Sequence, residues 1–328
     1  THDIMAQWLK DQAITEVECL VSDIAGIPRG KILPVHKFSQ AAAGQGLRLP
    51  EYVFGQSVTG AFLDSAVLNE IGKDVILRPD PGTCRLVTWY NEPTAQIIHD
   101  AFDHDGSIVP FSPRAVLKRV LALFESAGLR PIVAPELEFF LVQQSADANS
   151  PLVTPSGRSG RPEKARQAYG IDAVNEFDPL FEDIYDHCEV QKIDIDTLSH
   201  EAGAAQMEIN FNHGEALELA DQTFLFKRTV RQTSLDHNVH ATFMAKPMQE
   251  QPGSAMHLHV SVVDIESGRN LFVNEDSSES DQFYHALAGM QRYLVAAMPL
   301  MAPYVNSYRR QSNSEDSPTN LALSLIHI

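Results

Sequence analysis

Three short segments of the chain place glutamate and histidine at alternate positions, where a buried strand would carry only apolar side chains. In a strand, side chains i and i+2 point to the same face of the sheet. Each segment is therefore expected to present one polar and one apolar face. The polar faces carry Glu136 and Glu138; Gln206, Glu208 and Asn210; and His257, His259 and Ser261. The apolar faces carry Leu137 and Phe139, Met207 and Ile209, and Leu258 and Val260.

Glutamate and histidine are also the side chains that bind divalent metals. With Glu201 included, the candidate ligands are four carboxylates and one imidazole, from Glu136, Glu138, Glu201, Glu208 and His257. Hard cations such as Mg²⁺ and Mn²⁺ prefer oxygen ligands, and Mn²⁺ also accepts imidazole. Structural zinc sites favour cysteine and histidine, so this set argues against zinc. The sequence therefore predicts a Mg²⁺ or Mn²⁺ site, and two such ions would clamp the oxygens of a transferring phosphoryl group.

A plainer interpretation of the same pattern stays open. Solvated antiparallel strands also alternate, although their polar face usually mixes lysine, threonine, serine and glutamate. In that case Glu201 would be a surface residue, and His259 a core histidine with satisfied ring nitrogens. The chain has neither a Gly-rich Walker sequence nor a G-x-G-x-x-G motif, so any ATP would bind without a P-loop.

The segments must be positioned by a mixture of strands and helices. Short strand patterns dominate residues 14–100, and Ser112 before Pro113 indicates the start of a helix that runs to residue 127. Further on, the pattern predicts helices over 217–237 and 282–298, a strand over 241–245, and a surface loop over 144–165. We therefore predict an α+β protein with two domains, residues 14–105 and residues 106–328.

Composition limits the compartment and the partners. The 328-residue chain has a net charge of −18 and no basic run, which argues against a groove for nucleic acid. Its three cysteines, Cys19, Cys84 and Cys188, are scattered and odd in number, which indicates a reducing compartment. No apolar run reaches the ~18 residues of a membrane span. We expect a cytoplasmic protein that does not associate with membranes.

Six motifs, in order along the chain, resemble the glutamine synthetase family, and the resemblance runs from about residue 15 to residue 322. The motifs lie at Asp23–Lys31, Pro135–Phe140, Glu201–Asn210, Thr242–Pro247, Gly253–Ser261 and Asn306–Arg310. The resemblance implies an N-terminal β-grasp domain and a larger catalytic domain, in which a mostly antiparallel curved sheet is flanked by helices. It also implies a homo-oligomer of stacked rings with active sites between subunits.

The resemblance assigns roles to individual residues. It implies one metal held by Glu138, Glu201 and Glu208, and a second held by Glu136 and His257. Three further residues, Asp196, His259 and Ser261, are implied to contact the nucleotide. Gly253 is implied to lie beside the substrate glutamate, and Arg310 to clamp a substrate carboxylate. The implied reaction uses ATP to phosphorylate the γ-carboxylate of glutamate, and an amine then displaces phosphate.

Departures from the family pattern bear on the amine. Gly55 stands where glutamine-forming enzymes carry an aspartate that helps to bind ammonium, and the γ-glutamyl-polyamine synthetase branch often lacks that aspartate. Asp316 falls where a loop glutamate normally lies near the incoming amine. Ala205 and Ala255 replace family glycines. We therefore expect a polyamine or another alkyl amine as acceptor, with ammonia as the alternative.

The end of the sequence also departs from the family. After Pro318–Ala322 the family continues with a strand that carries a metal-binding glutamate and a second substrate arginine, whereas this chain reads Leu323–Ile328. The C-terminal part of the family domain is therefore expected to be missing, and the chain as given is expected to lack ligase activity. A catalytically idle family member with a structural or regulatory role is the alternative of another class.

Overall fold

The computed structural model of the chain describes residues 2–62, 73–147 and 149–313. These residues form two compact units. The first unit contains residues 1–123 together with 187–193 and 220–228, and the second contains the remainder. The predicted division at residue 105 stays a prediction. The mixture of helices and sheets confirms the predicted α+β class.

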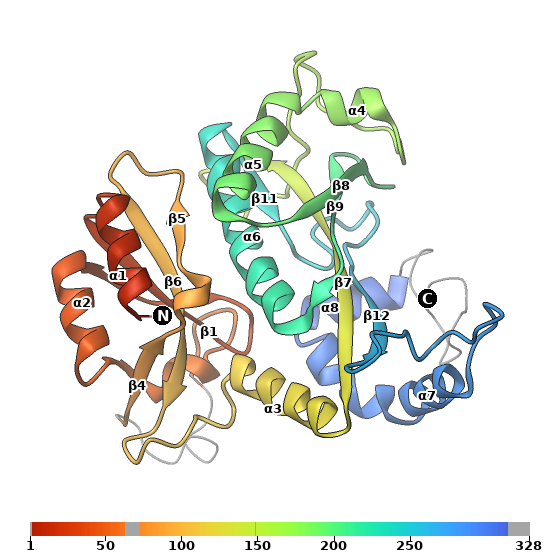
Figure 1. Cartoon of the computed structure of the whole chain (residues 1–328). Helices are drawn as coiled ribbons and strands as arrows, with labels where there is room; N and C mark the ends of the chain where they lie inside the picture. Colours follow the sequence, from red (N-terminus) through yellow and green to blue (C-terminus); the bar gives the residue numbers. More distant parts are fainter. Residues whose placement is uncertain (1, 63–72, 148, 314–328) are drawn as a thin grey trace. The chain divides into compact units, whose positions relative to one another are not determined.

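The first unit is built on one mixed sheet with helices packed against it (Figure 1). The strands follow the order β2-β1-β6-β4-β3, and β5 pairs with β6. The β1–β6 pair is parallel and the other pairs are antiparallel. The elements are α1 (His2–Asp11), β1 (Glu16–Ser22), β2 (Pro28–Pro34), α2 (Val35–Ala43), β3 (Leu47–Pro50), β4 (Asp74–Pro79), β5 (Arg85–Val87), β6 (Thr94–Phe102) and α3 (Pro113–Ser126), with short 3-10 helices at Glu51–Gly55 and Pro81–Thr83.

Apolar side chains from α1, α2 and the central strands form the core of the first unit. Leu9 of α1 and Phe38 of α2 pack with Val17 and Ile97 in one buried cluster. A second cluster gathers around the fully buried Phe54. Burial of these side chains is the main stabilising contribution to the unit.

The first unit also buries a charged cluster around Arg114 of α3. The guanidinium lies 2.6 Å from an Asp80 carboxylate oxygen, 2.7 Å from one of Asp100 and 2.9 Å from one of Asp221. Lys118 adds a 2.5 Å ion pair with Asp100. The Arg114 side chain is only 8 % exposed, so the three aspartates supply the acceptors that replace water around it.

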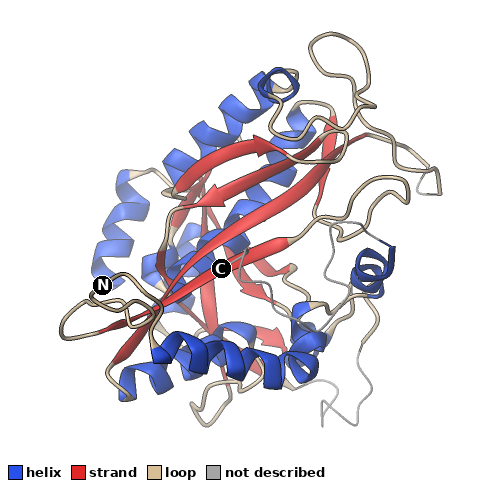
Figure 2. Cartoon of the chain, turned by 90° about the vertical axis from the view of Figure 1, so that its right-hand side faces the viewer, coloured by secondary structure: helices blue, strands red, loops and turns tan. Residues whose placement is uncertain are grey.

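The second unit is built on a six-stranded sheet around the long strand β7; Figure 2 draws the strands of both units in red. Strand β9 pairs along one edge of β7 with β8 outside it, and β12 and β11 pair along the other edge. The elements from residue 129 onward are β7 (Leu129–Gln143), α4 (Ile171–Asn175), α5 (Asp178–Gln191), β8 (Ile195–His200), β9 (Gln206–Phe211), β10 (Gly214–Glu215), α6 (Ala216–Asp236), β11 (Val239–Thr242), β12 (Met256–Asp264), α7 (Asp281–Met301) and α8 (Val305–Asn313). The end of α5 and the middle of α6, residues 220–228, belong to the first unit.

Most predicted elements of the second unit are confirmed, and some differ. Helices α6 and α7 match the predicted segments within a few residues. The strand predicted over 241–245 is observed as β11 over Val239–Thr242, because the pairing with β7 begins at Val239 and ends at Thr242. Helix α5 and strand β8 were not predicted. No helix within the described residues is long and apolar enough to cross a membrane.

The candidate active site

Strand register brings the three predicted polar faces onto one surface. Glu138 of β7 lies directly opposite Glu208 of β9. Glu136 lies opposite Asn210 of β9 on one side and His257 of β12 on the other. Side chains directly opposite each other in an antiparallel pair point to the same face. The alternation seen in the sequence is therefore repeated across three neighbouring strands.

The apolar faces differ between these strands. Leu137, Phe139, Met207 and Ile209 of β7 and β9 are almost fully buried, as a two-faced strand requires. In β12, by contrast, Leu258 is 52 % and Val260 45 % exposed. Leu258 and Val260 line a hollow beside β12, so these apolar side chains are less completely covered.

The side chains on the polar surface are close enough to share a cation. One ligand atom from each of Glu136, Glu208 and His257 lies within 4.8 Å of the others. The Nδ1 atom of His257 is 3.2 Å from Glu136 Oε2 and 4.0 Å from Glu138 Oε1. The Nε2 atom of His259 is 2.9 Å from Glu136 Oε1. The structure thus groups Glu208 with Glu136 and His257, the pair that the family resemblance assigned to the second metal.

The carboxylates of this surface repel one another. Burial, the charge of Glu201 and the charge of Glu136 raise the pKa of Glu138 to about 7, although Ala255 and Arg310 oppose the rise. Burial and the charges of Glu136, Glu201 and Glu138 raise the pKa of Glu208 to about 7 as well. A divalent cation relieves this repulsion, and carboxylate oxygens with one imidazole suit Mg²⁺ or Mn²⁺. The residues therefore fit the predicted metal.

Gln206 holds the Glu138 carboxylate in place by hydrogen bonding, a role that the sequence did not reveal. Its Nε2 atom donates to Glu138 Oε2 at 3.0 Å and to the carbonyl oxygen of Gly253 at 2.9 Å. The backbone N–H of Ala255 donates to the same Glu138 oxygen at 3.0 Å. The alternation did place Gln206 on the polar face, which was the only signal available. These bonds fix the orientation of the Glu138 carboxylate.

Gly253 and Arg310, both predicted to bind substrate, lie in contact. A Cβ atom at Gly253 would lie 2.5 Å from Arg310 Cγ and 2.7 Å from the carbonyl oxygen of Ala245, so only glycine fits there. Asn306 anchors α8 through reciprocal bonds with the backbone of Lys246, at 2.7 and 2.9 Å. Residues four apart share a helix face, so this anchor also directs Arg310.

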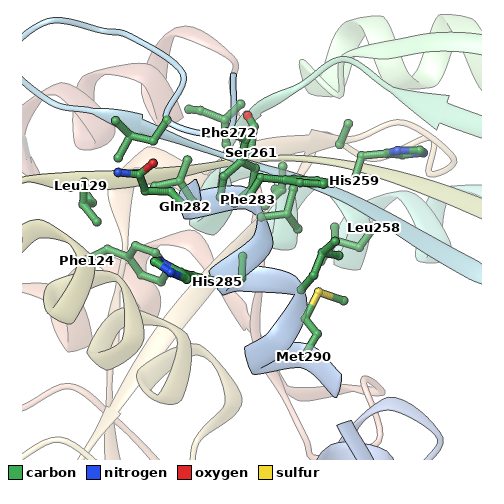
Figure 3. Close-up of a pocket in the computed structure, with 18 of the residues that line it drawn as sticks. Phe124, Leu129, Leu258, His259, Ser261, Phe272, Gln282, Phe283, His285 and Met290 are labelled. Carbon is green, nitrogen blue, oxygen red and sulfur yellow. The ribbon is translucent and has the colours of Figure 1, made fainter. Parts of the chain in front are cut away.

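The residues predicted to contact the nucleotide are not all brought together. His259 and Ser261 border a hollow of about 660 Å³, which the apolar side chains of β12 and α7 largely line (Figure 3). In Figure 3, Met290 of α7 lies next to Leu258 of β12. Asp196 is exposed at an irregularity in β8 and does not line this hollow. Asp316 lies outside the described residues.

Comparisons with known proteins agree with this arrangement. Residues 110–326 match the family described as "Glutamine synthetase, catalytic domain". The chain is 35 % identical over 305 residues to gamma-glutamylputrescine synthetase PuuA of Escherichia coli, covering 90 % of this chain and 62 % of that protein. It is 31 % identical over 321 residues to the glutamine synthetase of Halobacterium salinarum, covering 96 % of this chain and 66 % of that protein. The chain therefore spans a little under two thirds of the length of these relatives.

A solved structure shows the same fold. The structure titled "Apo GmaS without ligand" superimposes with a TM-score of 0.77 at 24 % identity, over 93 % of this chain and 67 % of that one. The family match, residues 110–326, covers well over half of the 328 residues. The matched range includes the strands that form the polar surface. The chain belongs to the glutamine synthetase family.

Proposed function

We propose that this protein is an ATP-dependent ligase that joins the γ-carboxylate of glutamate to an amine through a γ-glutamyl phosphate. The observation that carries the proposal is the surface formed by Glu136, Glu208 and His257, with Glu138 beside it. Its carboxylates suit a cation that neutralises a transferring phosphoryl group. Membership of the glutamine synthetase family supports the reaction class.

The proposed site keeps the roles implied by the family resemblance. One metal takes Glu138, Glu201 and Glu208, and the other takes Glu136 and His257. When bound, these ions supply positive charge to the oxygens of ATP and of the acyl phosphate. We propose that His259, Ser261 and Asp196 contact the nucleotide. The substrate glutamate lies beside Gly253, and its carboxylate pairs with Arg310. The contact between Gly253 and Arg310 supports that last pairing.

The chemistry follows from the weakness of a carboxylate as an electrophile. Transfer of the ATP γ-phosphoryl group to the glutamate γ-carboxylate creates a mixed anhydride, and ADP leaves. The amine then attacks the acyl carbon, the C–O bond to phosphate breaks, and inorganic phosphate leaves. Arg310 stabilises the negative charge that develops during these steps. We assign removal of the amine proton to Asp316.

We propose a polyamine or another alkyl amine as the acceptor. Gly55 supports this, because the family aspartate that binds ammonium is replaced there; Gly55 is buried at the end of a short 3-10 helix. The name of the 35 % identical relative, gamma-glutamylputrescine synthetase, supports it too. Ammonia is the second candidate, supported by the 31 % identity to a glutamine synthetase. A cytoplasmic homo-oligomer of stacked rings completes the proposal.

A panel of amines tests the proposal on the natural full-length protein. Phosphate release from ATP and glutamate is measured with ammonia, methylamine and putrescine, and kcat/KM is compared. We expect putrescine or methylamine to exceed ammonia. A larger kcat/KM for ammonia would overturn the acceptor assignment, and no amine-dependent release would favour an idle family member. Replacing Gly55 by aspartate should raise the ratio of ammonia to putrescine activity.

A further inference from the structure

The turn that joins β8 to β9, residues 201–205, carries Glu201 at its first position. Two of its backbone N–H groups donate to side chains from other parts of the second unit. Ala204 N donates to Gln251 Oε1 at 3.0 Å, and Ala205 N donates to Glu163 Oε2 at 2.8 Å. These two bonds tie the end of the turn to residues that lie far from it in the sequence.

Ala205 makes the turn conformationally demanding. Its φ angle is +56°, in the left-handed region, which costs a non-glycine residue about 1–2 kcal/mol. The residue is clasped on both sides: Glu163 accepts its N–H, and the N–H of Leu141 in β7 donates to its carbonyl oxygen at 2.9 Å. A strained residue of this kind persists only where its surroundings hold it in place.

Glu163 also contacts His200, which in turn contacts the first residue of the turn. The His200 side chain is fully buried, and its Nε2 atom lies 3.1 Å from the Glu163 carboxylate. The Nδ1 atom lies 2.6 Å from the carbonyl oxygen of Glu201. Gln167 Nε2 donates to the other Glu163 oxygen at 2.8 Å. A single carboxylate thus connects the residue before Glu201 to the last residue of the turn.

The bonds from Glu163 and His200 hold the turn that carries Glu201. The backbone N–H of Glu201 donates to the carbonyl oxygen of Gln206 at 2.8 Å, which continues the register that sets His200 opposite Met207. Glu201 therefore lies opposite Gln206, on the same face of the sheet as Glu208 and Glu138. The Glu201 carboxylate also accepts from the N–H of Ala202 at 3.1 Å, which ties its orientation to the turn. A shift of the turn would therefore displace the Glu201 carboxylate from the polar surface.

We propose that Glu163 and His200 are positioning residues for the metal site: their buried pair holds the 201–205 turn and keeps the Glu201 carboxylate at the carboxylate surface. The inference rests on the proposed function only in that it assumes a metal at this surface. Residues that orient metal ligands typically change metal affinity by about 10–100-fold when they are removed.

Binding of Mn²⁺ tests the inference without reference to catalysis. Free Mn²⁺ is titrated by electron paramagnetic resonance against wild type, Glu163→Ala and Glu163→Gln. We expect Glu163→Ala to weaken binding by about 10-fold or more. Glu163→Gln keeps an acceptor for Ala205 and a polar partner for His200, so its affinity should stay within roughly threefold of wild type. Ligase assays should show the same order in the Mn²⁺ concentration needed for half-maximal rate.

Glu176→Ala is the matched control. Glu176 accepts the N–H of Ser159 at 2.8 Å, so it anchors the same 144–165 loop, and no bond from it to the turn is seen in the described residues. Equal loss of Mn²⁺ affinity in Glu176→Ala and Glu163→Ala would overturn the inference. If Glu163→Ala does not fold, His200→Asn carries the test, because it loses the Nε2 contact and should also weaken binding.

The outcomes separate this inference from the proposed function. Normal Mn²⁺ binding by wild type, together with no amine-dependent phosphate release in the amine panel described above, would remove the proposed function and leave the positioning test valid. No Mn²⁺ binding by wild type would overturn the inference together with the metal site. Wild-type affinity in both Glu163→Ala and His200→Asn would overturn the inference alone.

Discussion

The two units each gather acidic side chains, and they balance the resulting charge differently. In the first unit, Asp80, Asp100 and Asp221 surround the guanidinium of Arg114 at 2.6 to 2.9 Å. In the second unit, Glu136, Glu138, Glu201 and Glu208 crowd one another, and Glu138 and Glu208 have pKa values of about 7. The aspartate cluster is neutralised by the protein's own Arg114, whereas the glutamate cluster suits an added metal cation.

The pKa values of the aspartates in the first cluster reflect the positive charge of Arg114. Burial alone would raise the pKa of Asp80, but the hydrogen bond and charge of Arg114 bring it below its usual value. Burial raises the pKa of the more deeply placed Asp221 even though Arg114 opposes the rise. The Arg114 cluster thus contributes to stability, whereas the glutamate surface is suited to binding.

Removing the internal cation is expected to have the largest effect. Arg114→Met removes the guanidinium from Asp80 and Asp221 and leaves Asp100 with Lys118 alone, which should lower the free energy of unfolding by about 3–5 kcal/mol. Both tryptophans, Trp8 and Trp89, belong to the first unit, so urea unfolding followed by tryptophan fluorescence reports on it. A loss below about 1 kcal/mol would contradict the structural role of the cluster.

Removing a candidate metal ligand from the glutamate cluster of the second unit should abolish the stabilisation that an added metal produces. A ligand that binds only the folded state stabilises it by about 2.7 kcal/mol at roughly 100 times its Kd. Glu138→Gln should lose most of the rise in Tm that Mn²⁺ or Mg²⁺ produces. Glu215→Gln is the control, because Glu215 is exposed and pairs with Arg130. An unchanged Tm shift in Glu138→Gln would argue against Glu138 as a ligand.

The glutamate surface should also respond to pH. The folded-state pKa values of Glu138 and Glu208, about 7, lie above the ordinary 4.5, so the metal-free folded state binds more protons than the unfolded state between these values. The stabilising contribution of these groups is therefore present below about pH 4.5 and is lost as the pH rises through 7.

The measurement compares the Tm of metal-free wild type and metal-free Glu138→Gln from about pH 5 to pH 8. The difference isolates this surface from other groups such as His99, whose pKa burial lowers to about 4. We expect wild type to lose stability relative to the variant as the pH rises. The Tm shift caused by Mn²⁺ should increase over the same range, because the metal competes with protons. A relative gain for metal-free wild type would contradict the assignment.

The smallest effect is expected at the exposed edge of the first cluster. The Lys118 side chain is 31 % exposed, and its partner Asp100 keeps the bond to Arg114 when lysine is removed. Lys118→Ala should therefore cost only about 0.2–1 kcal/mol in urea unfolding. A loss as large as that of Arg114→Met would show that the cluster depends on both cations equally.

The sequence by itself determined which side chains share a strand face. Alternation placed Glu136 with Glu138 and Gln206 with Glu208, because the side-chain period of a strand is two, and β7 and β9 confirm those segments as strands. The ordered motifs also indicated the family, which the match over residues 110–326 confirms. These features follow from local spacing, so they are visible without a structure.

Only the tertiary structure decided which residues meet. The opposition of Glu138 to Glu208 depends on strand register, and a slip of one residue would turn the side chains to the other face. Glu163 lies in a segment that the composition marked only as a surface loop, yet it bonds to His200, 37 residues away, and Ala205, 42 residues away. Such bonds join distant segments, and no local periodicity encodes them.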